Sequence, residues 1–337
     1  MMKKALSFDD VLLVPKFSNL SSRQDADISS QLDDNHKFSL PVISSPMDTV
    51  TEATMARAMH KAGGLGIIHR YNDPTGQVRL FAEADVPAAV AIGMNGDYME
   101  RAATAVEFGC TILCVDVAHG HHVMMESCLK SLKDKFGSSV HIMAGNVATR
   151  EALDALASWG ADSVRVGIGG GSICSTRLVS GHGVPTFASI LDCAQTEHDV
   201  KIIADGGIKT TGDMVKAYAA GADFVMIGSM LAGTKESPGE VFKNTDGKEY
   251  KVYRGMASSA AQNDWRGKSS TPEGISTTIT YKGSVEGILR DIEGGIKSGL
   301  SYSGVKNLKD LHAKSEFVIQ TPAGQAESFT HILARNK

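Results

Sequence analysis

Residues 201–227 read KIIADGGIKTTGDMVKAYAAGADFVMI, and this stretch decides the fold because it holds a strand, a helix and a second strand in succession. Its ends, residues 201–204 and 224–227, are short apolar runs. Between them, apolar residues recur every three or four residues. That spacing is typical of one buried helix face, and runs that are apolar almost throughout are typical of parallel strands covered on both sides. The stretch therefore predicts a parallel βα unit.

The same alternation continues outward from this stretch, back to about residue 38. Six more strands are predicted, over residues 40–44, 66–69, 88–93, 112–116, 141–144 and 163–166, with helices over 52–61, 97–107, 123–135, 150–158, 211–219 and 284–298. Eight such units in a chain of 337 residues predict one α/β domain over residues 1–337, a (β/α)8 TIM barrel, with a doubly wound sheet as the alternative. Polar residues and glycines follow most strands directly, which in a barrel places them on the C-terminal rim, where active sites are built.

Two segments depart from the alternation. Residues 235–282 separate strand eight from its helix and are rich in Gly, Ser, Thr and charge, so we expect a flap or lid over the rim. After Lys306 follow a short predicted strand, 317–320, and a tail, 321–331, which we expect to dock on a neighbouring subunit.

Composition excludes several classes of protein. The formal charge is −4 and basic residues do not cluster among aromatic ones, so nucleic acid is not expected as a partner. No apolar stretch reaches the roughly 18 residues of a membrane span, and no apolar leader follows the N-terminal lysines, so we expect a cytoplasmic protein. The five cysteines include no Cys-x-x-Cys pair and are expected to be free thiols, with Cys110 and Cys114 in packing roles rather than at a metal.

The stretch Gly167-Ile-Gly-Gly-Gly-Ser-Ile-Cys-Ser-Thr-Arg177 follows the sixth strand and carries the main chemical prediction. Its glycines let the backbone approach a ligand closely, so the loop can hold a phosphate or coordinate a monovalent cation through carbonyl oxygens. Asp205-Gly-Gly207 and Gly228-Ser229 follow strands seven and eight, where many barrels bind phosphate. Cys174 lies among exposed amides and hydroxyls, which favours a thiolate nucleophile that acts on a phosphorylated small molecule.

Three further features follow strands or lie in the insertion. Asp116 ends an apolar strand, where an unpaired carboxylate is costly, so we expect it to point into the rim site toward a ribose hydroxyl. Three neighbouring histidines invite a metal interpretation, but no carboxylate set accompanies them and a structural or exposed role is favoured: His119, His121 and His122. Glu273 is a candidate general acid or base that flap closure would bring in.

Taken in order, the motifs of this chain resemble those of the IMP dehydrogenase and GMP reductase family along nearly its whole length. The motifs are Leu6-Ser-Phe-Asp-Asp-Val-Leu-Leu-Val-Pro15, Ser45-Pro-Met-Asp-Thr-Val-Thr-Glu52, Ala144-Gly-Asn-Val147, Gly169-Gly-Gly-Ser-Ile-Cys-Ser-Thr176, Ile203-Ala-Asp-Gly-Gly-Ile208, Glu236-Ser-Pro-Gly239, Tyr253-Arg-Gly-Met256 and Tyr281-Lys-Gly283. The resemblance implies a (β/α)8 barrel, usually a homotetramer, that acts on a purine nucleoside monophosphate with a nicotinamide cofactor.

The resemblance also implies roles for individual residues. Cys174 would bond to C2 of the purine as a thioimidate, with Thr176 and Glu273 handling protons. The substrate-binding set would be Ser45, Met47, Ser172, Asp205, Gly207, Gly228, Ser229, Tyr253, Gly255 and Met256, with Asp205 on the ribose. The nicotinamide side would be lined by Asp116, Asn146 and Gly167. Backbone carbonyls of Gly169, Gly171 and Cys174 would form a potassium site, although Gly170 stands where the family usually has proline.

Two reactions remain possible within this resemblance. Dehydrogenases of the family typically carry a regulatory CBS insertion after the second strand, but here only a short span links Arg70 to Ala89. They also typically carry an arginine–tyrosine pair in the flap that activates water, but residues 258–274 contain no Arg-Tyr. We therefore predict an NADPH-dependent GMP reductase. An NAD-dependent IMP dehydrogenase with a short flap is the alternative, because Ser45–Glu52 and Tyr253–Met256 look more like that branch. A non-catalytic purine-nucleotide sensor is the alternative from another class.

Overall fold

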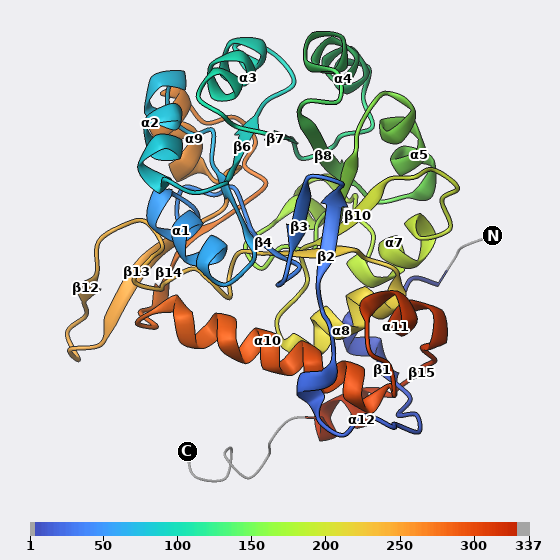
Figure 1. The fold of residues 1–337 in the computed structure, drawn as a ribbon. Helices are drawn as coiled ribbons and strands as arrows, with labels where there is room; N and C mark the ends of the chain where they lie inside the picture. Colours follow the sequence, from blue (N-terminus) through green and yellow to red (C-terminus); the bar gives the residue numbers. More distant parts are fainter. Residues whose placement is uncertain (1–3, 329–337) are drawn as a thin grey trace.

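The computed structural model describes residues 4–328 and shows a closed barrel of eight parallel strands (Figure 1). Each strand pairs with the next along the chain, and the last closes onto the first. This confirms the eight predicted strands and the barrel rather than the doubly wound sheet. The barrel strands are β4 (Val42–Ser44), β5 (Leu65–Ile68), β6 (Ala89–Ile92), β7 (Ile112–Asp116), β8 (His141–Val147), β9 (Ser163–Val166), β10 (Lys201–Asp205) and β11 (Phe224–Ile227).

Helices surround the barrel and cover the outer face of its strands (Figure 1). Two of them begin at a capping threonine, because the Thr149 and Thr210 side chains accept hydrogen bonds from backbone amides in the first turns of their helices. The predicted helices form within a few residues of the expected bounds, and around the barrel the structure adds α2, α6 and α7. The helices are α1 (Ala53–Lys61), α2 (Pro74–Ala84), α3 (Tyr98–Glu107), α4 (Val123–Phe136), α5 (Arg150–Ser158), α6 (Thr176–Ser180), α7 (Thr186–Cys193), α8 (Thr211–Ala220) and α10 (Val285–Tyr302).

A β-hairpin closes the N-terminal end of the barrel. It consists of β2 (Ser30–Asp33) and β3 (His36–Phe38), which lie across the opening in Figure 1. Leu32 and Phe38 pack against the inward-facing side chains of the strands, and the Phe38 ring contacts that of Phe224 edge-on, with centroids 5.7 Å apart. Because the hairpin seals this end, ligands have access to the barrel from the opposite, C-terminal rim.

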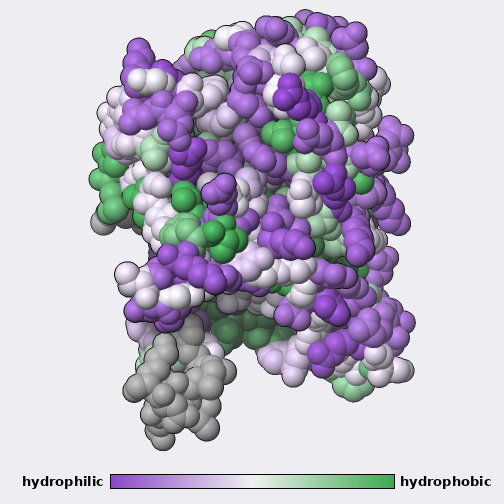
Figure 2. Space-filling model, turned by 90° about the vertical axis from the view of Figure 1, so that its left-hand side faces the viewer, coloured by the Kyte–Doolittle hydropathy of each residue, from purple (hydrophilic) through white to green (hydrophobic). Residues whose placement is uncertain are grey.

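The insertion at residues 235–282 folds into a small sheet and a helix. Strands β12 (Phe242–Lys243), β13 (Glu249–Arg254) and β14 (Ser276–Thr280) pair antiparallel, and α9 (Ser259–Arg266) connects the last two. Figure 2 shows the side of the molecule that carries this sheet, where hydrophilic residues predominate with hydrophobic patches among them. Exposed apolar side chains of the insertion include Phe242 and Ile275.

The two ends of the described chain meet beside the barrel. The predicted strand near residue 317 is confirmed as β15 (Phe317–Ile319), and it pairs antiparallel with β1 (Val11–Leu13). Short elements complete the chain: η1 (Phe8–Asp10), η2 (Arg23–Asp25), α11 (Leu308–Lys314) and α12 (Pro322–Glu327). Residues 329–331 of the predicted docking tail lie outside the described residues. Among those that are described, no helix combines the length and apolar character that a membrane crossing requires.

Candidate active site

The loop after β9 packs directly against the loop after β10, and glycines make this approach possible. A Cβ on Gly167 would lie 1.8 Å from the carbonyl oxygen of Asp205, and a Cβ on Gly170 would lie 2.6 Å from Thr186 Oγ1. Gly167 and Gly169 also have positive φ angles, of +150° and +80°. Gly167 is therefore required by the close approach of the two rim loops, whereas Gly170 lies against a side-chain hydroxyl at the start of α7.

Cys174 lies at the end of the glycine loop with an exposed side chain. Its thiol donates a hydrogen bond to Thr176, with 3.2 Å between Sγ and Oγ1. The other four cysteines are buried, and burial raises the pKa of each thiol to about 12: Cys110, Cys114, Cys128 and Cys193. Cys174 is therefore the thiol that a substrate on the rim can reach, while the others serve packing.

The flap docks on the cysteine loop through backbone hydrogen bonds. The Ser175 amide donates to the Glu273 carbonyl at 2.9 Å, and the Ile275 amide donates to the Ile173 carbonyl at 3.0 Å. Between these bonds Cys174 and Gly274 form an antiparallel bridge. The structure thus brings the predicted general acid or base, Glu273, to the segment that carries the predicted nucleophile.

Five of the predicted substrate-binding residues enclose one space beside β11. A Cβ on Gly228 would lie 3.3 Å from Met47 Sδ and 3.4 Å from both Ser45 Oγ and Tyr253 Oη. Ser172 Oγ lies 3.2 Å from the same Tyr253 hydroxyl. Burial raises the pKa of Tyr253, so its phenol stays neutral and can donate a hydrogen bond. Hydroxyls from two rim loops and from strand β13 therefore converge on Gly228, where the glycine leaves room for their close approach.

Gly255 and Met256 continue from β13 along the same rim. The Gly255 amide donates to the Ile275 carbonyl at 3.0 Å, and Met256 Sδ lies 3.5 Å from the Asp48 amide. Arg254 holds Asp48 in place, with 2.6 Å between Nη2 and Oδ2. These contacts fix the turn at residues 255–256 against the loop after β4.

The remaining predicted ligand-binding positions offer backbone groups. The Ser229 carbonyl accepts a hydrogen bond from Lys282 Nζ at 2.7 Å, and burial lowers the pKa of that lysine. Gly207 has a φ of +77°. The Gly171 carbonyl accepts from the Cys174 amide at 3.1 Å and so closes a turn within the cysteine loop.

A buried arginine, Arg165, joins two of the predicted carboxylates. Its Nη1 lies 2.5 Å from Asp116 Oδ1, and its Nη2 lies 2.8 Å from Asp205 Oδ2. Burial opposes the charge of the guanidinium, but the carboxylates of Asp205 and Asp116 outweigh it and raise the arginine pKa. Asn146 Nδ2 also donates to Asp205 Oδ2, at 2.8 Å, and to the Gly167 carbonyl. Asp116 therefore has a protein partner where we expected only a ribose hydroxyl.

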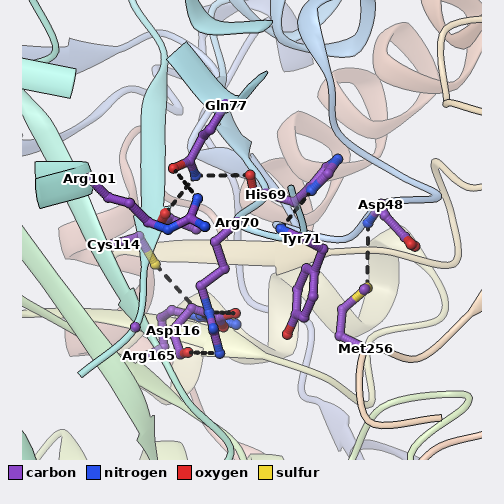
Figure 3. Close-up of polar contacts among 12 residues, drawn as sticks. Asp48, His69, Arg70, Tyr71, Gln77, Arg101, Cys114, Asp116, Arg165 and Met256 are labelled. Atoms are coloured by element: carbon purple, nitrogen blue, oxygen red, sulfur yellow. Dashed lines mark hydrogen bonds and ion pairs between the residues drawn. The ribbon is translucent and has the colours of Figure 1, made fainter. Parts of the chain in front are cut away.

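A second arginine and two aromatic rings extend this network toward the flap. Figure 3 shows Arg70 reaching toward Asp116 and Arg165, and Arg70 Nη2 donates to the Asp116 carbonyl at 3.2 Å. The Arg70 guanidinium lies 5.2 Å from the Tyr71 ring and 5.4 Å from the Trp265 ring, and the two rings meet edge-on at 5.2 Å. Trp265 belongs to α9 of the flap, so the flap helix stacks on the rim here.

Several buried polar atoms in this region have no hydrogen-bond partner in the protein. Among the described residues, atoms without a hydrogen-bond partner include Asn146 Oδ1, Arg70 Nε and Thr186 Oγ1, and of these Arg70 Nε forms a longer ion pair with Asp116 Oδ2 at 3.8 Å. An acceptor and two potential donors that face the rim without hydrogen-bond partners indicate that a polar ligand or water completes the site.

Two of the three histidines that follow β7 have structural contacts, in agreement with the role favoured from the sequence. His122 Nδ1 accepts a hydrogen bond from the Met124 amide and caps α4, and the His121 ring packs on Trp159, with ring centroids 6.0 Å apart.

Four residues of this network were not predicted from the sequence: Arg165, Arg70, Tyr71 and Trp265. A signal for Arg165 was present, since it is a charged residue inside the apolar strand Ser163–Val166 and a buried charge needs a partner. Arg70 and Tyr71 follow β5 as other rim residues follow their strands, so their position on the rim could also have been predicted. The contact of Trp265 with them depends on how the flap folds back, which the local sequence does not encode.

Comparisons with known proteins agree with this geometry. Residues 5–331 match a family model described as the IMP dehydrogenase / GMP reductase domain. Two similar proteins are inosine-5′-monophosphate dehydrogenases: one from Cryptosporidium parvum is 37% identical over 97% of this chain and 95% of its own length. The other, from Nitrosopumilus maritimus, is 32% identical over 98% of both chains.

A solved structure is similar over the same length. It is a cysteine-to-alanine variant of GMP reductase from Trypanosoma brucei in complex with guanosine 5′-monophosphate, and it matches with a TM-score of 0.92 and 30% identity over 98% of both chains. The sequence relatives and this structural relative thus carry the names of two different activities.

Proposed function

This chain belongs to the IMP dehydrogenase/GMP reductase family, whose members are oxidoreductases that use nicotinamide dinucleotides, and from that premise we propose that it is an NADPH-dependent GMP reductase. The reaction would convert GMP to IMP and ammonia. The observation that carries the proposal is the contact of the exposed Cys174 thiol with Thr176, in a loop to which the flap residue Glu273 is hydrogen bonded.

We assign the bond changes to these residues. Cys174 Sγ, as thiolate, adds to C2 of the purine, and the C2–N bond to the exocyclic amine breaks. The amine takes up one proton to depart as ammonia, which balances the proton that the Cys174 thiol loses, and the Thr176 hydroxyl beside the sulfur, together with the Glu273 carboxyl, is placed to relay it. Hydride addition to C2 of the resulting thioimidate and cleavage of the C–S bond then return the thiolate.

The space around Gly228 is proposed to hold the nucleotide. Ser172 and Tyr253 would donate hydroxyl hydrogen bonds to the phosphate, with backbone groups of Gly207, Gly228 and Ser229. Asp205 would hold the ribose, and the base would lie against Ser45, Met47 and the backbone at Gly255 and Met256. The hydroxyls of Ser45, Ser172 and Tyr253 that gather around this glycine support the assignment.

The residues beside this space fit a nicotinamide cofactor, which would supply the hydride when bound. Asn146 Oδ1 is a buried acceptor without a hydrogen-bond partner, which suits the carboxamide of the ring, and Arg70 Nε is a donor whose contact is a 3.8 Å ion pair with Asp116. Asp116 and Gly167 would line the same side. The Trp265 ring, stacked on the rim by the flap, provides an aromatic face for a planar group.

A monovalent cation such as potassium remains part of the proposal. The carbonyls of Gly169, Gly171 and Cys174 would hold it. The Gly171 carbonyl already accepts one hydrogen bond within the turn, but a carbonyl oxygen has a second lone pair for a cation.

An NAD-dependent IMP dehydrogenase is the second candidate, because the sequence relatives named above carry that activity. A dehydrogenase must activate water, and Arg70 and Tyr71 are an adjacent arginine and tyrosine at the rim. However, Tyr71 lies under Trp265, and burial raises the pKa of its hydroxyl to about 12. A phenol with that pKa is a poor base at neutral pH, which supports the reductase.

One spectrophotometric experiment separates the two reactions. Purified protein with GMP and NADPH is expected to consume NADPH and release ammonia in equal amounts. Production of NADH from IMP and NAD, with no consumption of NADPH by GMP, would replace the reductase with the dehydrogenase. Binding of GMP without turnover of either cofactor would indicate the nucleotide sensor. We propose a homotetramer as the working assembly, which sedimentation would test.

A further inference from the structure

Two histidines and an aspartate meet at the sealed end of the barrel, far along the strands from Cys174. Asp33 ends β2, His36 begins β3 and His141 begins β8. Asp33 Oδ1 lies 2.8 Å from His36 Nδ1, and Asp33 Oδ2 lies 2.7 Å from His141 Nδ1. Each residue offers one ligand atom, and these atoms lie within 4.8 Å of one another. From this cluster we propose a binding site for a divalent transition metal ion, best fitted to Zn²⁺.

The choice of metal follows from the ligand atoms. Two imidazole nitrogens and one carboxylate oxygen suit Zn²⁺, whereas Mg²⁺ and Ca²⁺ prefer oxygen ligands alone. A water molecule or the second oxygen of Asp33 would complete four-coordination. Ligand atoms around Zn²⁺ lie roughly 3.3 Å apart for bonds of about 2.0 Å, so the two rings must each move from the carboxylate by roughly half an ångström. Asp33 and His36 both lie on the two-stranded hairpin at the end of the barrel, so a shift of the hairpin can separate the carboxylate from His141 while β8 stays in place.

The second ring nitrogens have the partners that metal-bound histidines usually have. His36 Nε2 lies 2.8 Å from Thr111 Oγ1, and His141 Nε2 lies 2.9 Å from Ser163 Oγ. When Nδ1 binds a metal, Nε2 carries the proton and donates it to such an oxygen, which fixes the ring orientation.

Burial and charge also favour a bound cation. The His141 side chain is fully buried, and those of His36 and Asp33 are 14% and 31% exposed. The cluster carries the negative charge of Asp33, which would offset half the charge of a divalent ion. His36 lines a cavity of about 600 Å³ together with Lys37, Phe38 and His60, and this cavity gives an ion a path to the cluster.

Cobalt binding tests the site independently of turnover. All proteins carry Cys174→Ala, so that the exposed thiol cannot bind the metal. Titration with Co²⁺ is expected to give the visible absorption of a tetrahedral site at one equivalent, to be displaced by Zn²⁺, and Zn²⁺ is expected to raise the Tm. His36→Gln should lose at least about 100-fold in metal affinity, and Thr111→Val, which removes only the partner of Nε2, about 10-fold.

His198→Gln is the matched control, because His198 is exposed on the surface and should leave the affinity unchanged. The proposal is overturned if the parent binds no equivalent of Co²⁺ or Zn²⁺, in which case the cluster is a hydrogen-bonded network only. It is equally overturned if His36→Gln and Thr111→Val both bind as tightly as the parent. Should His36→Gln fail to fold, Thr111→Val alone decides.

Discussion

At the C-terminal end of the barrel an exposed thiol, two carboxylates and two arginines face one another, whereas at the N-terminal end Leu32 and Phe38 of a hairpin fill the opening. The C-terminal end leaves polar atoms such as Asn146 Oδ1 without a protein partner. At the N-terminal end the ring nitrogens of His36 and His141 all have partners. This contrast indicates that unsatisfied polar groups mark the end where a substrate is to bind.

The two ends also differ in what holds them together. The sealed end is held by apolar packing of Leu32 and Phe38 against side chains that the barrel strands direct into the interior. The rim depends on segments that are distant in the chain: the flap contributes backbone bonds to the cysteine loop, and Arg165 bridges the ends of β7 and β10. Substitutions at the rim should therefore change activity, and substitutions at the sealed end should change stability alone.

The largest effect is expected from Cys174→Ser. If the thiol forms the covalent bond to C2, the rate of NADPH consumption with GMP should fall by at least about 10⁴-fold, since loss of a nucleophile removes the whole covalent route. Binding of GMP, measured by calorimetry, should persist. Thiol titration is the control: one thiol should react in the native parent and none in the variant, because the other four are buried and have raised pKa values. A variant with more than a tenth of parental activity would contradict this role.

Arg165→Met should cost stability as well as activity. It leaves the Asp205 carboxylate, only 16% exposed, without the guanidinium that pairs with it, and it leaves Asp116, 15% exposed, with its longer ion pair to Arg70 at 3.8 Å. We expect a loss of about 3–5 kcal/mol in the free energy of unfolding, measured with urea at neutral pH. Arg79→Met is the matched control, because Arg79 is exposed on α2. Equal stability of both variants would show that Arg165 does not balance the carboxylates.

Leu32→Ala tests the sealed end by itself. The Leu32 side chain is 2% exposed and packs into the barrel interior, so its truncation should lower the free energy of unfolding by about 2–4 kcal/mol. Neither kcat nor KM should change, because the hairpin lies at the end of the strands away from Cys174. The same substitution at Leu12, which is 38% exposed, is expected to have little effect. A changed KM for GMP in Leu32→Ala would show that the two ends are coupled.

The barrel could be predicted well because its signals are local and repeated. Each strand is a short apolar run, and each rim loop follows a strand, so Cys174 and Gly228 could be placed on one rim from the order of residues alone. Contacts between distant segments were not predictable in this way. Arg165 was visible as a charge in a buried strand, but its two carboxylate partners follow other strands, and Trp265 reaches Tyr71 only because α9 folds back over the rim.

The smallest effect is expected at Trp265, where the flap meets the rim. Trp265→Ala removes the ring that lies 5.2 Å from the ring of Tyr71 and 5.4 Å from the guanidinium of Arg70. If that ring offers a face to the cofactor, KM for NADPH should rise about 5- to 10-fold, which is the loss of roughly one aromatic contact, while KM for GMP stays the same. Trp265→Phe keeps an aromatic face and should remain within about 2-fold of the parent. A rise in KM for GMP instead would indicate that Trp265 contacts the nucleotide and would contradict its assignment to the cofactor.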